Sequence, residues 1–181
     1  MLFDSHAHIN EASYSPEERA ELIKTIEASD VDYVADIGYD LASSKLAVEH
    51  AARYPWCYAV VGCHPHDARS MDDMELAMYK GLARKKKVVA IGEIGLDFHY
   101  DHSPRDIQRE WFRRQIRMAN QLKMPIVIHS READQETMDI LKEEGAFSEE
   151  RKSWFPKRPD PSGYTLKKSE AAKKTPDDPA D

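Results

Sequence analysis

The predicted fold is decided by three consecutive stretches: KVVAIGEIGLD (87–97), PRDIQREWFRRQIRMANQLK (104–123) and PIVIHS (125–130). The first and third are apolar almost throughout, which is typical of strands covered on both faces of a sheet. The stretch between them starts with proline, which is favoured in the first turn of a helix, and is long enough for a complete helix. Two parallel strands joined by a helix are the repeating unit of α/β proteins.

The same alternation extends toward both ends of the chain. We expect further strands in LFDSHAH (2–8), VDYVADIG (31–38) and WCYAVVG (56–62), and further helices over 15–28, 41–54, 71–84 and 131–145. The helix at 15–28 opens with Ser-Pro-Glu-Glu, a capping residue followed by proline and acidic residues. Five such units in series predict an α/β fold, either a doubly wound sheet or part of a (β/α) barrel.

Length and composition divide the chain into two parts. At 181 residues it is shorter than a complete (β/α)₈ barrel, which takes about 250 residues. Residues 1–146 hold 18 Lys/Arg and 26 Asp/Glu, whereas 147–181 hold 8 and 7, together with five of the ten prolines. Leu166 is the only Leu, Ile, Val or Met in that tail, so we expect 147–181 to be a mostly disordered, polar Pro/Lys-rich tail, in which Trp154 and Phe155 could dock locally.

Several classes of protein are excluded by the same composition. No apolar stretch is long enough for a membrane span, and the first residues lack the basic region of a signal peptide. Cys57 and Cys63 form no disulfide framework, so we expect a cytoplasmic protein. A net charge of −7 argues against purely electrostatic binding to nucleic acid. We also expect a monomer.

Residues with metal-binding chemistry gather where the expected strands end. Seven of the eight histidines lie within a few residues of such an end. Ligands bind at the carboxyl ends of parallel strands, and imidazole with carboxylate suits Zn²⁺, Mn²⁺ or similar ions. The sequence therefore predicts a shared metal site built from His6, His8, Glu93 and His129.

Each of these four residues could also have a role that involves no metal ion. His6 and His8 could be solvated loop residues, and His129 could be a hydrogen-bonded core histidine. Glu93 could pair with a lysine, although a carboxylate in an apolar strand needs a partner or a metal. The common position of all four residues on their strands favours the metal site.

Two basic clusters outside the strand ends have no predicted role in binding. Arg105, Arg109, Arg113 and Arg117 form an i, i+4 stripe on the long helix. We interpret it as an outward helix face with local pairing to Asp106 and Glu110 rather than a DNA-facing patch. The basic run at 84–87 is interpreted as a solvated turn.

Four motifs, in this order and spacing, resemble the TatD family of metal-dependent deoxyribonucleases: DSHAHIN (4–10), GCHPHD (62–67), GEIGLDFHYD (92–101) and PIVIHSREA (125–133). They cover about the first three-fifths of a family member. The resemblance implies a partial TIM-type (β/α) barrel with about five of eight βα units.

The resemblance also implies an activity and a set of site residues. A family member is a two-metal hydrolase, with Mg, Mn or Zn as the ions, that removes nucleotides from single-stranded DNA ends in the 3′–5′ direction. Two divalent ions suit an in-line displacement at a phosphodiester and would neutralise its charge. The implied ligands are His6 and His8 for one ion, His129 for the other, and Glu93, the central catalytic residue, for both. The implied substrate-binding residues are His64, Asp97, Tyr100 and Arg131.

One departure from the family pattern concerns activity. A complete member supplies a further histidine in a His-x-Phe/Tyr-Ser-Gly motif and an aspartate in a Thr-Asp-Ser/Cys-Pro motif. No histidine follows His129 here, and the tail aspartates lie outside any strand-like context. Our hypothesis is a C-terminally truncated or frameshifted product with weak metal binding and low or absent nuclease activity. The alternatives are another metal hydrolase acting on a small amide, lactone or phosphotriester, or an inactive fragment. Glu93, at a position where such hydrolases often use a lysine, favours the nuclease.

Overall fold

The computed structural model describes residues 1–156 as an α/β fold built on one five-stranded sheet. Each strand pairs in parallel with the next one along the chain. The strands are β1 (Phe3–Ala7), β2 (Tyr33–Ile37), β3 (Cys57–Val61), β4 (Val88–Asp97) and β5 (Ile126–Arg131). The helices are α1 (Pro16–Glu27), α2 (Leu41–Arg53), α3 (Asp73–Leu82), α4 (Arg105–Leu122), α5 (Asp134–Glu143) and α6 (Glu149–Ser153), with a 3₁₀ helix, η1 (Pro65–Ser70). The predicted partial barrel of five βα units is confirmed.

Local sequence explains where the helices begin and end. The Ser15 side chain caps α1 and forms a capping box with Glu18, as the motif predicted. Asp40 and Ser43 form the corresponding box at the start of α2. After α5 the chain turns at Gly145, whose φ of +72° is a left-handed value that glycine adopts without strain.

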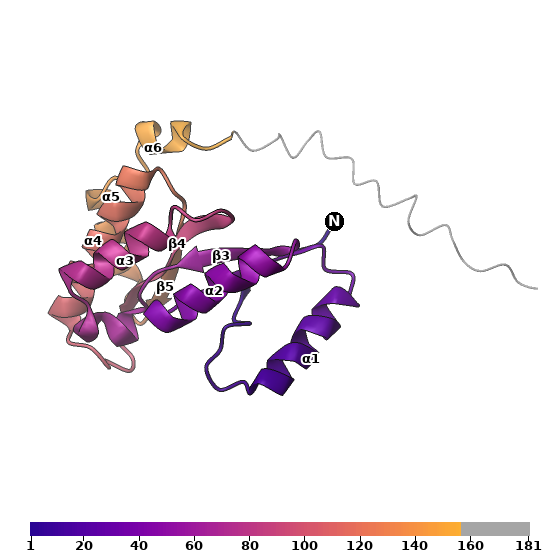
Figure 1. The fold of residues 1–181 in the computed structure, drawn as a ribbon. Coiled ribbons are helices and arrows are strands. Elements are labelled where there is room, and N and C mark those ends of the chain that lie inside the picture. The colour runs from indigo at the N-terminus through magenta and orange to yellow at the C-terminus, as the bar shows by residue number, and fades with distance from the viewer. Residues whose placement is uncertain (157–181) are drawn as a thin grey trace, which may run out of the picture.

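The helices cover the outer face of the curved sheet (Figure 1). The main core lies between them and the strands, with Tyr79 from α3, Phe112 from α4 and Ile91 from β4 all fully buried. The inner face holds a small cluster of short side chains, made of Ala35, Ile37, Val60 and Ala90. This arrangement leaves the carboxyl ends of the strands as one edge on which side chains from several strands can meet.

The tail differs from the prediction in its first residues. We expected a mostly disordered tail from residue 147 onward, with local docking of Trp154 and Phe155, but Glu149–Ser153 form a helix, α6, capped by the Ser148 side chain. Arg151 is only 4% exposed; it donates hydrogen bonds to the Asn120 side chain and, over 2.8 Å, to the Met124 carbonyl. The prediction counted only apolar residues and therefore missed an arginine whose burial is compensated by hydrogen bonds. The remainder of the predicted tail, 157–181, lies outside the described residues.

The arginine stripe of α4 makes ion pairs, but not with Asp106 and Glu110 of its own helix, which we expected as partners. Arg105 pairs with Asp101, Arg109 with Glu136, and both Arg113 and Arg117 with Glu144. The partners of Arg109, Arg113 and Arg117 lie on or just after α5, so those three arginines join two neighbouring helices rather than facing a ligand.

The basic run at 84–87 is a solvated turn only in part. The Lys87 ammonium donates hydrogen bonds to the carbonyls of Ala51, Tyr54 and Pro55, at 2.8, 2.6 and 3.1 Å. Lys87 thus caps the carboxyl end of α2, where a positive charge is favourable.

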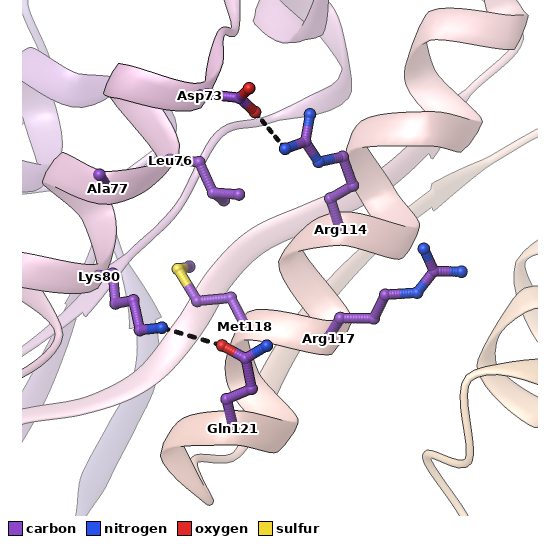
Figure 2. A pocket seen from close by; sticks show the side chains of 8 residues that line it. All are labelled: Asp73, Leu76, Ala77, Lys80, Arg114, Arg117, Met118 and Gln121. Atoms are coloured by element: carbon purple, nitrogen blue, oxygen red, sulfur yellow. Dashed lines mark hydrogen bonds and ion pairs between the residues drawn. The ribbon is translucent and has the colours of Figure 1, made fainter.

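A groove between α3 and α4 lies apart from the strand ends (Figure 2). Arg114 pairs with Asp73 across it, and Lys80 donates a 2.9 Å hydrogen bond to Gln121. The polar side chains of the groove are engaged in these two contacts or, for Arg117, in its ion pair with Glu144, and no histidine lines the groove. Among residues 1–156, no helix combines the length and the apolar character needed to cross a bilayer.

Candidate metal centre

The four residues predicted as metal ligands lie together at the carboxyl edge of the sheet. Two groups of ligand atoms, each within 4.8 Å of one another, share the Glu93 carboxylate. We call His6, His8 and Glu93 the edge triad, after the edge strand β1, and His64, Glu93 and His129 the inner triad; β5, which carries His129, is the other edge strand of the sheet. A carboxylate common to two ligand groups has the arrangement needed to bridge two ions.

The edge triad is open to solvent. His6 lies on β1 with its side chain 42% exposed, and its Nε2 is 3.4 Å from Glu93 Oε2. The His8 ring lies 5.1 Å from the His6 ring, and its Nδ1 donates a 2.9 Å hydrogen bond to the carbonyl of Ile37. Because a carbonyl can only accept, Nδ1 carries the proton and Nε2 keeps its lone pair for a metal.

The inner triad is held by a hydrogen-bond network. His129 Nδ1 is 3.3 Å from Glu93 Oε1, and its Nε2 is 3.0 Å from Asp97 Oδ2. Burial lowers the pKa of His129, but the hydrogen bonds to Glu93 and Asp97 outweigh it and raise the pKa overall. With Nε2–H donated to Asp97, Nδ1 is the nitrogen that faces Glu93, and it would bind a metal ion after releasing the proton that it donates to that carboxylate.

Glu93 is ionised in this environment. Burial raises the pKa of its carboxyl, but the hydrogen bond with His129 and the nearby His64 and His6 lower it below its usual range. The residue is 9% exposed. A buried carboxylate surrounded by imidazoles is a strong candidate to bind a cation.

His64 has a different hydrogen-bonding state from the other histidines. Burial, with the neighbouring His129 and His66, lowers its pKa to about 3, so the ring is neutral near pH 7. Its Nδ1 accepts a hydrogen bond from the backbone N–H of His66 at 3.2 Å. The proton therefore lies on Nε2, which makes His64 a hydrogen-bond donor in its present tautomer rather than a ready metal ligand.

Asp97 lies behind the ligands instead of facing the cavity. Its side chain is 1% exposed, and one oxygen binds both His129 and His66, the latter at 2.9 Å. The other oxygen accepts the backbone N–H groups of His99 and Tyr100. Burial raises the pKa of this carboxyl, but the hydrogen bonds from Tyr100, His66 and His129 hold it well below its usual range. This geometry favours an orienting role over the substrate contact that we predicted for Asp97.

Tyr100 and Arg131 lie together at the rim of the site. The Arg131 guanidinium stands 4.5 Å from the centre of the Tyr100 ring, and the His102 ring stacks parallel to that ring. Tyr100 is 48% exposed, so its edge is accessible from solvent. The two predicted substrate-binding residues are thus brought together, with a cationic group and an aromatic surface side by side.

A cavity of about 340 Å³ opens between the triads. Its lining includes His8, His64 and Glu93 from the predicted set. The prediction missed the other lining residues, which are Glu11, Tyr39, His66 and Asp67. Tyr39 follows the end of β2, so the strand-end rule that selected the histidines applies to it as well.

The family follows from a comparison with known proteins. A family model described as TatD related DNase matches residues 3–152. The chain belongs to the TatD family. The match runs past Gly145 into α6, so the TatD-like part is longer than the motifs indicated.

Two curated TatD-family relatives give the degree of similarity. The chain is 45% identical over 146 residues to "Uncharacterized metal-dependent hydrolase YabD" from Bacillus subtilis, covering 81% of this chain and 57% of that protein. It is 35% identical over 140 residues to "3'-5' ssDNA/RNA exonuclease TatD" from Cronobacter turicensis, covering 77% of this chain and 53% of that protein. The chain therefore spans about half the length of the curated relatives it matches.

Solved structures of TatD proteins share the fold. The TatD homologue YJJV from Escherichia coli K12 superposes with a TM-score of 0.70 at 27% identity, covering 79% of this chain and 56% of that one. A TatD family hydrolase from Entamoeba histolytica superposes with a TM-score of 0.72 at 22% identity, covering 80% and 55%.

Proposed function

We propose that the two triads are the protein part of a two-metal hydrolytic centre that cleaves phosphodiester bonds in single-stranded DNA from the 3′ end. The observation that carries this proposal is the Glu93 carboxylate, whose two oxygens face His6 on one side and His129 on the other. The name of the Cronobacter relative, a 3′–5′ exonuclease for single-stranded DNA and RNA, supports the substrate class.

Each side chain has a role in this proposal. The edge triad would hold one divalent ion (Mg, Mn or Zn), and Glu93 with His129 would hold the other. When bound, the ions supply charge neutralisation and Lewis acidity at the scissile phosphate. The Nε2–H of His64 would donate to a phosphate oxygen, since this ring is neutral and lies at the cavity. Arg131 and Tyr100 would bind the nucleotide next to it through charge and stacking.

We further propose that this stretch alone binds its ions weakly and has low nuclease activity. Within residues 1–156, the edge triad offers three ligand atoms, and Glu93 with His129 offers two for the second ion. Catalytic zinc sites usually have three protein ligands, so the second position is underpopulated here. We propose a cytoplasmic monomer as well, in line with the two cysteines, which are both free and buried.

The proposal is tested with single-stranded DNA that carries a fluorophore at its 5′ end. With Mn²⁺ we expect slow, stepwise shortening from the 3′ end, and no reaction with EDTA or with Glu93→Gln. Glu136→Gln is the matched control, because Glu136 pairs with Arg109 away from the site.

Three outcomes would contradict parts of this proposal. Cleavage that survives Glu93→Gln would remove Glu93 from the chemistry. Fast degradation, lost in Glu93→Gln, would overturn the low-activity proposal alone. Turnover of small esters or amides without any action on DNA would favour the alternative hydrolase.

A further inference from the structure

A row of buried polar side chains lies beside the edge triad and has no part in the proposed chemistry. His50 of α2 is 6% exposed, Asp36 of β2 is 0% exposed, and Asn10, just after β1, is 1% exposed. His50 Nδ1 donates to Asp36 Oδ2 at 2.7 Å, and the backbone N–H of Asn10 donates to Asp36 Oδ1 at 3.2 Å. Buried polar groups are costly unless paired, and apolar residues of similar size could fill such a space equally well.

This row ends at the carbonyl group that fixes His8. The Asn10 side-chain amide donates to the Ile37 carbonyl at 3.0 Å and to the Ser43 carbonyl at 3.1 Å. The same Ile37 carbonyl accepts the Nδ1–H of His8 at 2.9 Å. Asn10 thus binds the acceptor on which the His8 tautomer depends, while its own backbone is tied to Asp36.

We propose that Asn10, Asp36 and His50 are positioning residues that hold His8 with Nδ1 protonated and Nε2 directed to a metal ion. This inference rests on the proposed metal site and adds to it the residues that orient one ligand. Residues that do not contact the metal can have this effect, because hydrogen bonds behind a histidine ligand set both its tautomer and its ring orientation.

The sheet alone does not fix this ligand. β1 is exposed along most of its length, and its register with β2 shifts between Asp4 and Ala7, where the metal-facing histidines begin. The loop that follows β1 is instead fastened by other groups. Ile9 is buried in a small core with Ile23, and Arg19 of α1 donates to the Ile9 carbonyl at 2.9 Å. Within this loop, Asn10 is the residue that contacts the His8 acceptor.

The test uses Asn10→Ala, with Asn120→Ala as a matched control. Asn120 also donates its side-chain amide to a backbone carbonyl, that of Glu144 at 3.0 Å, and its oxygen accepts from the buried Arg151, so the control likewise loses buried hydrogen bonds, but on α4 and outside the site. By calorimetric titration with Zn²⁺, we expect Asn10→Ala to bind the edge-triad ion about 10-fold more weakly than the control does. In a His8→Ala background, Asn10→Ala should cause no further loss, because its effect is transmitted through His8.

A second measurement needs no metal. Long-range ¹H–¹⁵N correlation spectra of the imidazoles, taken at a pH where His8 is neutral, report which nitrogen carries the proton. We expect the Nδ1–H form in the wild type and in Asn120→Ala, and a mixture of both forms in Asn10→Ala.

The two measurements separate the possible failures. Unchanged affinity and an unchanged tautomer in Asn10→Ala would overturn the positioning role, even if the melting temperature falls. An equal loss of affinity in the His8→Ala background would also overturn it. If the wild type binds no Zn²⁺ while the tautomer changes as expected, the proposed metal site fails and the positioning of His8 stands.

Discussion

The edge triad and the inner triad share Glu93 but differ in how their other ligands are held. His6 lies on an exposed edge strand, and Glu93 is its ion-pair partner within the described part of the chain. His129 lies on β5 with its side chain 21% exposed and both ring nitrogens engaged by carboxylates. The inner triad is therefore preorganised by a network, whereas the edge triad depends on its loop for its geometry.

The edge triad is the less ordered of the two, but it offers more free lone pairs to a metal ion. The edge triad offers three groups with free lone pairs, because the proton of His8 faces Ile37. The inner triad contains His64, whose lone-pair nitrogen is already used by the His66 backbone. The inner triad is thus the better ordered half of the centre and the edge triad the half with more free lone pairs, and we expect the first equivalent of metal to bind the edge triad.

The largest effect should come from the shared residue. Glu93→Gln keeps the shape of the side chain but removes the charge from both triads, so we expect affinity for Zn²⁺ to fall by about 100-fold or more at both positions. Calorimetric titration measures both the affinity and the number of ions. Glu136→Gln should bind as the wild type does.

Loss of only one of the two ions in Glu93→Gln would change how the two triads are compared. If Glu93→Gln removes one ion and leaves the other at full affinity, the carboxylate serves a single triad. The two groups would then be independent sites rather than halves of one centre.

Asp97→Asn is expected to lower metal affinity by less, and only at the inner triad. The amide keeps the volume of the carboxylate but weakens the acceptor that orients His129 and His66. We expect the inner ion to bind about 10-fold more weakly, equivalent to about 1.4 kcal/mol, with the edge ion unchanged. The measurement is Zn²⁺ titration of both sites.

Asp101→Asn is the control for this variant, because Asp101 lies in the loop just after β4 and pairs with Arg105 in solvent. Equal weakening of both ions by Asp97→Asn would mean that Asp97 supports the whole edge of the sheet rather than the inner triad alone.

The comparison also explains what could be predicted from the sequence. Apolar strands separated by helices specify a parallel sheet, and parallel strands bring their carboxyl ends to one edge. Position on a strand was therefore enough to bring His6, Glu93 and His129 together. These are backbone properties, and they depend on short-range patterns that a sequence displays directly.

The features that the sequence did not predict depend on contacts between side chains that are distant in sequence. Asp36 and His50 become a buried pair only when α2 packs on β2, and the burial of Arg151 depends on two acceptors, Asn120 on α4 and the Met124 carbonyl just after it. The family resemblance implied that Asp97 binds substrate, yet its hydrogen bonds place it behind His129. Hydrogen-bond direction is decided by tertiary packing, so spacing alone could not give it.

The smallest effect on metal binding is expected from substitution of His64. This variant tests whether His64 is a metal ligand of the inner triad or a hydrogen-bond donor beside it. If His64 is a donor, as its tautomer indicates, His64→Ala should change Zn²⁺ affinity by less than about 2-fold while weakening single-stranded DNA binding about 10-fold, since one charge-assisted hydrogen bond is lost. Fluorescence anisotropy with a cleavage-resistant phosphorothioate oligonucleotide measures the affinity for single-stranded DNA.

His99→Ala is the control, because His99 pairs with Glu132 and does not line the cavity. A loss of Zn²⁺ affinity comparable to that of His129→Ala would show instead that His64 exchanges its tautomer and becomes a ligand, in which case the inner triad is as complete as the edge triad.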